Sequence, residues 1–232
     1  IDDVAAAPPG SAMNDREALL ARMLASGVYV VTDRAASLGR DEEEIVGAAI
    51  AGGVGAVQLR LKDASGRERY DVARRVAPLC RRAGVPFFIN DDVALAIAVG
   101  ADGVHVGQDD LPAAVVRALV GPAILVGVTA ATPSLALETS AAGADYVGVG
   151  AMFPTRTKGQ TLDTGLEGLR LVRRAVSVPI VAIGGIDSGN AASVVAAGAD
   201  VVAVVRAIVA ADDVEAAARQ LVDVVARARE QG

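Results

Sequence analysis

Short apolar runs alternate with longer helix-like stretches along most of the chain. The runs are rich in Val and Ile, which is typical of strands that are buried on both faces of a parallel sheet. Eight of them are predicted strands, at residues 28–32, 56–60, 86–90, 103–106, 124–128, 146–150, 179–183 and 201–205. The stretches that follow them predict helices at 41–52, 67–83, 92–99, 112–119, 133–142, 166–175, 188–197 and 212–230.

Eight strands, each followed by a helix, predict an α/β fold in the form of a single (β/α)8 TIM barrel. An open doubly wound sheet is the alternative. The glycine-rich fingerprint expected after the first strand of such a sheet is missing, because that strand ends in Thr32-Asp33-Arg34. We therefore expect residues 15–232 to form one catalytic barrel domain and residues 1–14 to form a flexible N-terminal tail.

One short pattern recurs before every second strand, as AVGADGVHVG (98–107), AAGADYVGVG (141–150) and AAGADVVAVV (196–205), with AGGVGAVQLR (51–60) as a weaker copy. In each copy a glycine ends a helix and a short turn enters the next strand. Such turns lie at the amino-terminal end of a barrel, the end that serves stability. The chemistry is therefore expected at the carboxyl ends of the strands.

Composition narrows the classes of function. The chain of 232 residues has a net charge of −6, three Phe, three Tyr and no Trp, and it lacks a run rich in Lys or Arg, so nucleic-acid binding is not expected. Mean hydropathy is +0.43, but the apolar runs are far shorter than the ~18–20 residues of a membrane-spanning helix. Cys80 is the single cysteine, which favours a reducing cytoplasm. A homo-oligomer is compatible with this composition.

The second predicted strand ends in a polar, cationic sequence. Because side chains alternate along a strand, Gln58, Arg60 and Lys62 share one face and are expected to point toward the barrel mouth. Burying two cations is costly, and a bound polyanion such as a phosphate would remove that cost. The alternative is a pair of surface cations. Only two of the 22 basic residues are lysines, Lys62 and Lys158, and both follow strands at this end of the barrel.

Carboxylates follow the next two strands. Strand 86–90 leads into Asn90-Asp91-Asp92, and strand 103–106 is followed by Asp109 and Asp110. Asp91 with Asp109 or Asp110 could hold Mg²⁺, which favours one or two carboxylates together with water and substrate phosphate. The alternative is that Asp92 and Asp110 cap the helices that follow them. One aspartate of each pair could cap while the other binds the metal.

Three inward-facing positions and one long loop point to a ligand in the barrel mouth. Gly148 and Gly150 lack side chains, which leaves room for a ligand or for close backbone approach. His105 also faces inward, either to contact a ligand or to pack as a hydrogen-bonded core residue. Loop 151–165 is the longest in the barrel, and loops of that length are usually functional. It carries Thr155, Arg156, Thr157 and Lys158.

A second anion site is expected after the last two strands. Strand 179–183 ends in Gly184-Gly185, and strand 201–205 ends at Val205-Arg206. Loops at these places often bind phosphate through backbone N–H groups. A pyrophosphate and a monophosphate could therefore bind on one rim, the former at Arg60, Lys62, Asn90, Lys158 and a metal.

The motifs QLRLKD, INDD, HVGQDD, GVTAAT, GVGAMFPTRTK and IGGI, which occur in this order between about Tyr29 and Ile208, resemble those of the thiamine-phosphate synthase family. The resemblance implies a transferase that joins hydroxymethylpyrimidine pyrophosphate to thiazole phosphate, with Mg²⁺ as cofactor. It also implies a dissociative substitution, in which pyrophosphate leaves, a pyrimidine-methyl cation forms and the thiazole nitrogen attacks.

The same resemblance implies roles for single residues. Pyrophosphate would contact Arg60, Lys62, Asn90 and Lys158, and Mg²⁺ would bind Asp91 and Asp110. Gln58 and Thr129 would lie at the pyrimidine. The thiazole phosphate would be held by Thr155, Thr157, Gly185 and the backbone of Val205 and Arg206.

The chain departs from the family pattern at four positions: Leu61 stands where an acidic residue is common, Thr129 replaces a usual Ser, Ala131 replaces His or another polar residue, and Arg206 replaces a small Ser. Three rival interpretations are a thiazole tautomerase of the same superfamily, a Schiff-base aldolase and a non-catalytic phosphate-binding barrel. The tautomerase would not need Lys62, the INDD motif and Asp110. An aldolase would need a lysine with a lowered pKa, and a non-catalytic barrel would be expected to lose the metal carboxylates first.

Overall fold

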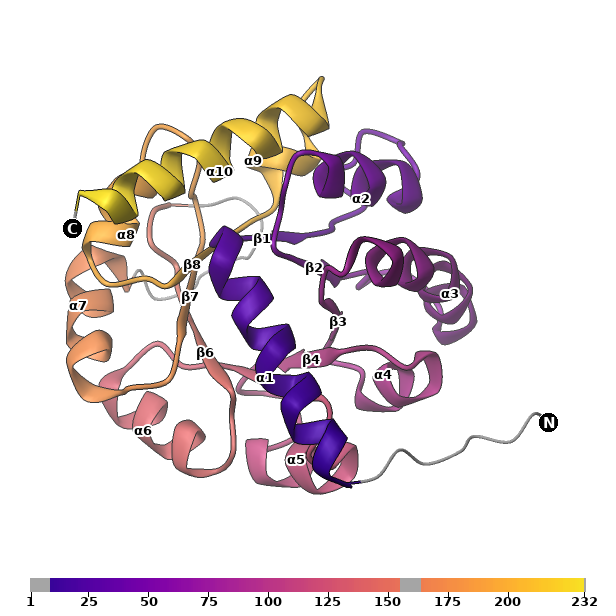
Figure 1. The fold of residues 1–232 in the computed structure, drawn as a ribbon, viewed down its shortest axis with the longest axis horizontal. Coiled ribbons are helices and arrows are strands. Elements are labelled where there is room, and N and C mark those ends of the chain that lie inside the picture. The colour runs from indigo at the N-terminus through magenta and orange to yellow at the C-terminus, as the bar shows by residue number, and fades with distance from the viewer. Residues whose placement is uncertain (1–8, 155–163, 232) are drawn as a thin grey trace.

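Eight parallel strands close into a barrel in the order of the sequence (Figure 1). The structure is a computed structural model, and it describes residues 9–154 and 164–231. The predicted TIM barrel is confirmed, and the open sheet is excluded because β1 pairs with β8. The strands are β1 Val28–Val31, β2 Ala56–Leu59, β3 Phe87–Asn90, β4 Gly103–Val106, β5 Leu125–Thr129, β6 Tyr146–Val149, β7 Ile180–Ile183 and β8 Val201–Val204.

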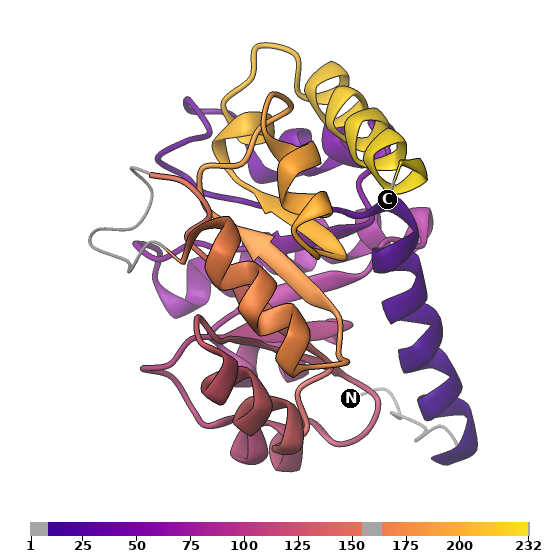
Figure 2. The same cartoon turned by 90° about the vertical axis from the view of Figure 1, so that its left-hand side faces the viewer.

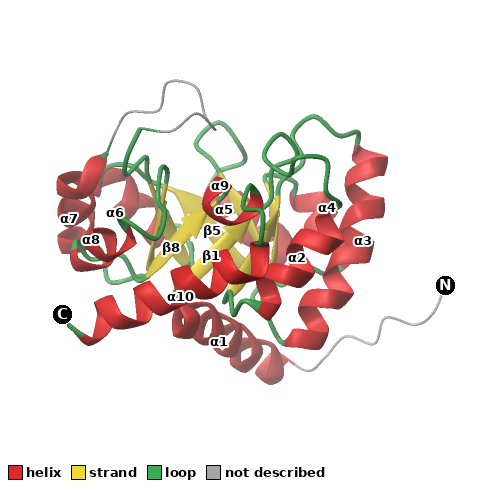
Figure 3. Ribbon diagram, turned by 90° about the horizontal axis from the view of Figure 1, so that it is seen from above, coloured by secondary structure: helices red, strands yellow, loops and turns green. Residues whose placement is uncertain are grey.

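Helices surround this barrel (Figure 3). They are α1 Pro9–Ser26, α2 Glu42–Ala51, α3 Gly66–Ala83, α4 Val93–Val99, α5 Ala113–Val120, α6 Pro133–Ala141, α7 Gly165–Ala175, α8 Ala191–Ala196, α9 Arg206–Val209 and α10 Val214–Glu230. Eight of them fall on the predicted helices, with ends that differ by a few residues. The other two, α1 and α9, were not predicted. Helix α1 begins at Pro9, inside the segment 1–14 that was expected to be a tail.

The barrel interior is filled by pairing large side chains with glycines on neighbouring strands. Phe88 on β3 is in register with Gly103 on β4, and Tyr146 on β6 is in register with Gly127 on β5. A Cβ atom at Gly103 would lie 2.2 Å from the Phe88 ring, and one at Gly127 would lie 2.1 Å from the Tyr146 ring. These glycines are therefore required by packing, because the aromatic rings occupy the space that their side chains would need.

Helix α1 crosses one end of the barrel and covers it (Figures 1 and 2). Met23 of α1 is fully buried in the interior cluster that includes Tyr29, Phe88 and Tyr146, and Leu19 and Leu20 pack against that cluster. This end is therefore closed by apolar side chains. Among the described residues, the end at which the strands finish is therefore the one where a ligand is expected.

The repeated GAD turns lie at the closed end, as expected. The aspartate of each turn accepts a hydrogen bond from a backbone N–H at the start of the preceding strand: Asp102 from Phe87 (2.9 Å), Asp145 from Val126 (2.7 Å) and Asp200 from Ile180 (2.7 Å). Arg117 and Arg173 form ion pairs with the second and third of these carboxylates. The repeat therefore stabilises the ends of strands and takes no part in the site at the barrel mouth.

None of the helices in the described part of the chain is both long enough and apolar enough to cross a membrane.

Candidate active site at the carboxyl ends of the strands

A chain of hydrogen bonds between polar side chains forms the floor of the barrel mouth. Gln58 Nε2 donates to the Tyr29 hydroxyl at 2.9 Å, and that hydroxyl lies 3.4 Å from the hydroxyl of Tyr146. The Tyr146 hydroxyl lies 3.1 Å from His105 Nδ1, and His105 Nε2 lies 3.0 Å from Thr129 Oγ1. These hydrogen bonds thereby connect Gln58 of β2, His105 of β4 and Thr129 of β5, the three residues that were predicted to contact substrate.

This floor is polar but carries no ionised phenol. Burial raises the pKa of Tyr29 above its ordinary value, although hydrogen bonds from Gln58 and Tyr146 oppose the shift. Burial likewise raises the pKa of Tyr146, and the neighbouring Tyr29 adds to the effect. Both phenols therefore remain protonated at neutral pH and act as hydrogen-bonding groups that fix the orientation of their neighbours.

His105 occupies the space that the missing side chain of Gly148 provides. A Cβ atom at Gly148 would lie 2.9 Å from His105 Cε1, and the His105 ring stacks on Tyr146 with 5.6 Å between ring centroids. At Gly150, a Cβ atom would lie 2.3 Å from the backbone oxygen of Ile183. Gly150 thus allows close backbone approach, one of the two readings that the sequence left open, whereas Gly148 makes room for the His105 ring.

Arg60 has a protein partner, contrary to the expectation of unpaired cations. Its Nη1 lies 2.5 Å from Asp33 Oδ2, and both side chains are largely buried, with 13% and 14% of their surface exposed. The backbone N–H of Arg60 donates to Thr32 Oγ1 at 2.9 Å. The Asp33 carboxylate offsets the cost of burying the guanidinium and holds it in one orientation at the rim.

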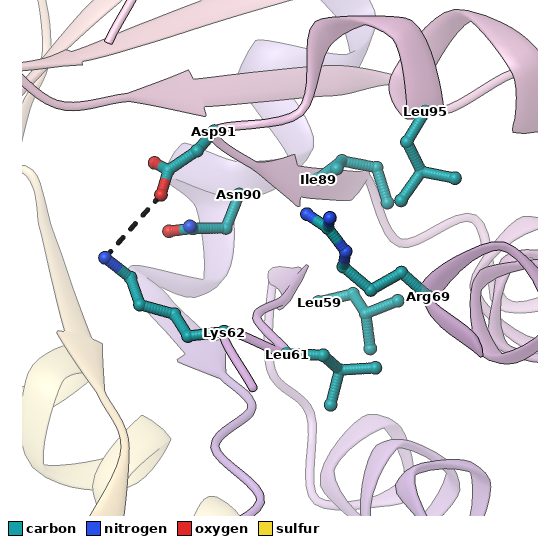
Figure 4. Close-up of a pocket in the computed structure, with 8 residues that line it drawn as sticks. All are labelled: Leu59, Leu61, Lys62, Arg69, Ile89, Asn90, Asp91 and Leu95. Atoms are coloured by element: carbon teal, nitrogen blue, oxygen red, sulfur yellow. Dashed lines mark ion pairs between the residues drawn. The ribbon is translucent and has the colours of Figure 1, made fainter. Parts of the chain in front are cut away.

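Lys62 also has a carboxylate partner. Its Nζ lies 3.7 Å from Asp91 Oδ2, and Figure 4 shows this pair beside Asn90 at the ends of β2 and β3. Half of the Lys62 side chain is exposed, so the ammonium group can still reach a ligand in the mouth. The structure therefore brings together the three residues Lys62, Asn90 and Asp91 from two strands, as predicted.

Asp91 lies next to the carboxylate of Asp110. Burial raises the pKa of Asp91, the negative charge of Asp110 raises it further, and Lys62 and Asn90 oppose the shift. The backbone of Asp91 has a φ of +61°, in the left-handed region that Asp and Asn tolerate better than most residues. Its N–H donates to the backbone oxygen of His105 at 2.8 Å, which ties this turn to β4.

The two aspartates of the INDD motif have different functions. Asp92 Oδ1 accepts a hydrogen bond from the backbone N–H of Leu95 at 2.9 Å and so caps α4, as predicted. The alternative in which Asp110 caps α5 is not what the structure shows, because Pro112 is the N-cap residue and Asp110 Oδ2 accepts from Gly107 N at 2.7 Å. Asp91 and Asp110 are therefore the two aspartates whose carboxylates lie together, and neither caps a helix.

The donor set of this pair fits Mg²⁺. Mg²⁺ prefers oxygen ligands and usually takes one or two carboxylates, completing its shell with water and substrate phosphate. Asp91 and Asp110 provide two adjacent carboxylates. The negative charge of Asp110 contributes to the raised pKa of Asp91, and a divalent cation would relieve the repulsion between the two. Within the described residues no third His, Cys, Asp or Glu joins them, so the protein alone does not complete a metal shell.

Two cavities adjoin these side chains. The larger, of about 320 Å³, lies between the loop after β1, the end of β2 and the start of α9, and is lined by charged side chains of Asp33, Arg34, Arg60, Lys62, Asp63 and Arg206. It therefore extends from Arg60 and Lys62, which were predicted to bind pyrophosphate, to Arg206, which was predicted to lie at the monophosphate. The smaller, of about 180 Å³, has Lys62, Asn90 and Asp91 at one end and the apolar side chains of Leu59, Leu61, Ile89 and Leu95 at the other (Figure 4).

Arg69 points into the smaller cavity from α3 (Figure 4). Its Nη1 lies 3.3 Å from Asp92 Oδ2, while its Nε is buried without a hydrogen-bond partner among the described residues. Leu61, the position where relatives commonly have an acidic residue, lines the same cavity. Arg69 thus links α3 to the start of α4, directly after Asp91.

The predicted monophosphate residues are only partly described. Gly185, with a φ of +67°, packs so closely on Phe153 that a Cβ atom would lie 2.8 Å from the Phe153 Cβ, and its backbone oxygen accepts from Asn190 Nδ2 at 2.9 Å. Val205 and Arg206 lie at the end of the neighbouring strand β8, at the start of α9. Thr155, Thr157 and Lys158 lie outside the described residues.

Sequence reasoning missed three residues of the site: Asp33, Tyr29 and Tyr146. A signal for all three was present, because Tyr29, Val31 and Asp33 alternate from β1 onward just as Gln58, Arg60 and Lys62 do from β2 onward. The same alternation places Tyr146 on the face of β6 that carries Gly148. The rule that placed the cations on the inward face would therefore also have placed Asp33 and the two tyrosines there, had it been applied to every strand.

Comparisons with known proteins identify the family of the chain. The family described as thiamine monophosphate synthase matches residues 28–208. A thiamine-phosphate synthase of Chloroflexus aurantiacus is 55% identical over 195 residues, covering 84% of this chain and 90% of the relative. One of Moorella thermoacetica is 50% identical over 203 residues, covering 87% and 97%.

A solved structure points the same way. The thiamine phosphate pyrophosphorylase of Pyrococcus furiosus superposes with a TM-score of 0.82 at 38% identity, covering 90% of this chain and 98% of that one. The match of the family to residues 28–208 includes β1 to β8 and every residue that the sequence assigned to the site. The chain belongs to the thiamine monophosphate synthase family.

Proposed function

We propose that this chain couples hydroxymethylpyrimidine pyrophosphate with thiazole phosphate to give thiamine phosphate and pyrophosphate. The observation that carries the proposal is the rim formed by β2, β3 and β4, where Lys62 pairs with Asp91, Asp91 lies next to Asp110, and Arg60 is held by Asp33. Cations and a pair of carboxylates fit a diphosphate that is bound together with a divalent metal.

In this proposal the diphosphate contacts Arg60, Lys62, Asn90 and Lys158. The Asp33 carboxylate keeps the Arg60 guanidinium in place before the substrate arrives, so less reorganisation is needed on binding. Lys62 exchanges part of its interaction with Asp91 for the substrate phosphates, because Asp91 then faces the metal.

Mg²⁺ would be held by Asp91 and Asp110. When bound, it supplies positive charge that neutralises the diphosphate as that group departs. The protein contributes the position of the two carboxylates: the left-handed backbone at Asp91 and the hydrogen bond from Gly107 to Asp110 fix them on the same rim.

The pyrimidine would lie on the floor of the mouth, against Gln58, His105 and Thr129. His105 and Tyr146 hold the Thr129 hydroxyl in a defined orientation through their hydrogen bonds. The thiazole phosphate would lie at the other end of the mouth, at Thr155, Thr157, Gly185 and the backbone of Val205 and Arg206. The cavity that spans Lys62 and Arg206 supports a path between the two phosphate groups.

The proposed reaction needs neither a protein nucleophile nor a protein base. The bond between the pyrimidine methylene carbon and the diphosphate oxygen breaks, and its electron pair leaves with pyrophosphate. The lone pair of the thiazole nitrogen then forms the new carbon–nitrogen bond to the cationic methylene. Stabilising the departing charge and aligning the two substrates would supply the catalysis, which matches a site of cations and neutral hydrogen-bonding groups.

The rival functions fit these side chains less well. A Schiff-base aldolase needs a neutral amine, whereas Lys62 lies 3.7 Å from a carboxylate that favours the charged ammonium. A tautomerase or a non-catalytic phosphate-binding barrel would have no use for the Asp91–Asp110 pair. Because the single cysteine favours a reducing compartment, we also place the reaction in the cytoplasm.

An assay with both substrates and Mg²⁺ tests the proposal and separates it from its rivals. We expect thiamine phosphate and pyrophosphate in equal amounts, detected by chromatography. Isomerised thiazole phosphate without coupling would indicate a tautomerase, and unchanged substrates would indicate a non-catalytic barrel. Lys158→Ala should lower kcat severely, and a wild-type rate in that variant would remove loop 151–165 from the mechanism.

A further inference from the structure

The hydrogen bonds at the floor of the barrel mouth form a chain in which the position of each proton can be worked out. Its five members come from five strands and are, in order, Gln58, Tyr29, Tyr146, His105 and Thr129. The polar atoms of successive members are 2.9, 3.4, 3.1 and 3.0 Å apart. We call these five residues the floor relay.

The direction of the floor relay is set at Gln58. Its amide nitrogen Nε2 is a donor, so the Tyr29 hydroxyl accepts that hydrogen bond. The Tyr29 hydroxyl is buried, and its other partner among the described residues is the Tyr146 hydroxyl. Since buried donors are generally satisfied, Tyr29 donates its proton to Tyr146. Both phenols keep their protons at neutral pH, because burial raises the pKa of each.

Tyr146 passes the same direction on to His105. The Tyr146 hydroxyl accepts from Tyr29, so its own proton goes to His105 Nδ1. A ring nitrogen that accepts a hydrogen bond carries no proton, and the proton of the ring therefore lies on Nε2. Nε2 in turn donates to Thr129 Oγ1. No described residue is left to accept the hydroxyl proton of Thr129, which is therefore available to a ligand in the mouth.

The amide oxygen of Gln58 is available to a ligand as well. Oε1 has no hydrogen bond to a described residue, because the amide contacts Tyr29 through Nε2. Among the described residues, Arg69 Nε is the one buried side-chain nitrogen or oxygen that lacks a partner. Gln58 Oε1 is therefore not sealed in the core, and it opens to the mouth.

We propose that Tyr29 and Tyr146 are positioning residues that give the two ligand contacts of the floor opposite polarity. Tyr146 holds His105 with its proton on Nε2, so that the Thr129 hydroxyl donates to the ligand. Tyr29 holds the Gln58 amide through Nε2, so that the amide oxygen accepts from the ligand.

The floor relay makes this polarity difficult to reverse. An isolated glutamine can turn its amide over and so accept either a donor or an acceptor. In the relay, Gln58 can turn over only if both tyrosines, His105 and Thr129 reverse their protons together, because a single reversal leaves a buried donor or acceptor unpaired. The floor is therefore built for one pattern of hydrogen-bonding groups.

That pattern is an N–H group facing Gln58 and a lone pair facing Thr129. An aminopyrimidine offers both, through its amino group and its ring nitrogens. In an oxopyrimidine a carbonyl oxygen replaces the amino group, so two acceptors would meet at Gln58. This choice of ligand rests on the proposed function, which places the pyrimidine on the floor, whereas the proton position on His105 does not.

Nitrogen-15 NMR of the imidazole ring, on the full chain without substrate, Mg²⁺ or a histidine tag, tests the relay. His105 is the single histidine, so the spectrum reports one ring. We expect one tautomer, with the proton on Nε2. Folded Tyr146→Phe should show a mixture of tautomers, because the donor to Nδ1 is gone. Tyr70→Phe, which changes the third tyrosine of the chain on α3, should match wild type.

A wild-type ring with its proton on Nδ1, or on both nitrogens, overturns the proposal. A folded Tyr146→Phe that keeps the wild-type tautomer also overturns it, because Tyr146 would then not position the ring. The wild-type spectrum alone decides the direction of the relay if the variant does not fold.

Calorimetric titration with Mg²⁺ and either hydroxymethylpyrimidine pyrophosphate or its oxo analogue tests the polarity. Wild type should bind the analogue at least about 30-fold more weakly. Tyr29→Phe frees the Gln58 amide and should narrow this ratio about fivefold or more, while His105 keeps its proton on Nε2. Equal binding by wild type, or an unchanged ratio in Tyr29→Phe, overturns the proposal. Binding of neither compound, with the proton on Nε2, contradicts the proposed function and still supports the relay.

Discussion

Replacing Asp91 by Asn is expected to stabilise the metal-free protein while it removes activity. Asn keeps the size of the side chain and tolerates the left-handed backbone, so the φ of +61° is no obstacle. The substitution removes a carboxylate whose pKa is raised by burial and by Asp110. It also removes the attraction between Asp91 and Lys62, whose charged atoms are 3.7 Å apart.

The magnitude follows from these opposed interactions. Two charges at about 4 Å interact by about 4 kcal/mol in surroundings with an effective dielectric constant of ~20. The repulsion by Asp110 and the attraction by Lys62 therefore largely cancel, and the cost of burying Asp91 decides the sign. Because Asp91 is only partly buried, we expect a net gain of about 1 kcal/mol in the free energy of unfolding, which raises the melting temperature by about 2–4 °C.

The gain should depend on pH in a defined direction. Because the pKa of Asp91 is raised by folding, the native state binds more protons than the unfolded state between the ordinary and the raised pKa. Wild type therefore loses stability relative to Asp91→Asn as the pH rises through that window. The difference should grow as the pH rises and should disappear in acid, below the ordinary pKa of an aspartate at about 4.

Thermal unfolding in the presence of EDTA, from pH 7.5 down to pH 4, measures this effect. Asp109→Asn is the matched control, because Asp109 is exposed and adjacent to Asp110, and its melting temperature should follow that of wild type. The coupling rate of Asp91→Asn with Mg²⁺ should fall at least about 100-fold. An Asp91→Asn protein that is less stable than wild type at pH 7 would refute the reasoning, since the attraction to Lys62 would then outweigh burial and repulsion.

Two further substitutions test other parts of the structure. Asp33→Asn removes the charged partner of Arg60, so kcat/KM should fall about tenfold because the guanidinium is no longer held in place; steady-state kinetics with an unchanged kcat/KM would argue against this positioning. Gly127→Ala places a Cβ atom 2.1 Å from the Tyr146 ring and should cost about 1–3 kcal/mol of stability, measured by chemical denaturation. Gly47→Ala, in open space on α2, is its control and should be neutral or stabilising.

The periodicity of the sequence was sufficient to predict the barrel, because each strand is a short apolar run and a longer helix-like stretch follows it. Two helices escaped prediction for different reasons. Helix α9 is only four residues long, Arg206–Val209, and continues the apolar run of β8. Helix α1 begins with Pro9-Gly10, a pair that usually marks a turn, although proline is also well suited to the first position of a helix.

Strand alternation predicted which residues of the site face the mouth, but it could not predict their partners. Lys62 and Asp91 come from neighbouring strands, and that proximity follows from strand order alone. The pairing of Arg60 with Asp33 depends on how β1 and β2 are staggered, which the sequence does not reveal. The left-handed backbone of Asp91, which separates its function from that of Asp92, is set by contacts with β4 and α4.

Binding of pyrophosphate to the purified protein tests most directly whether the rim of Arg60, Lys62 and the Asp91–Asp110 pair holds the diphosphate. We predict that calorimetric titration shows binding that requires Mg²⁺, and that Lys62→Met raises the dissociation constant about 10–100-fold, since one charge-assisted contact is lost. Arg67→Met, which changes an exposed cation of α3, should bind as wild type does. Equal affinity with and without Mg²⁺, together with an unaffected Lys62→Met, would contradict the account.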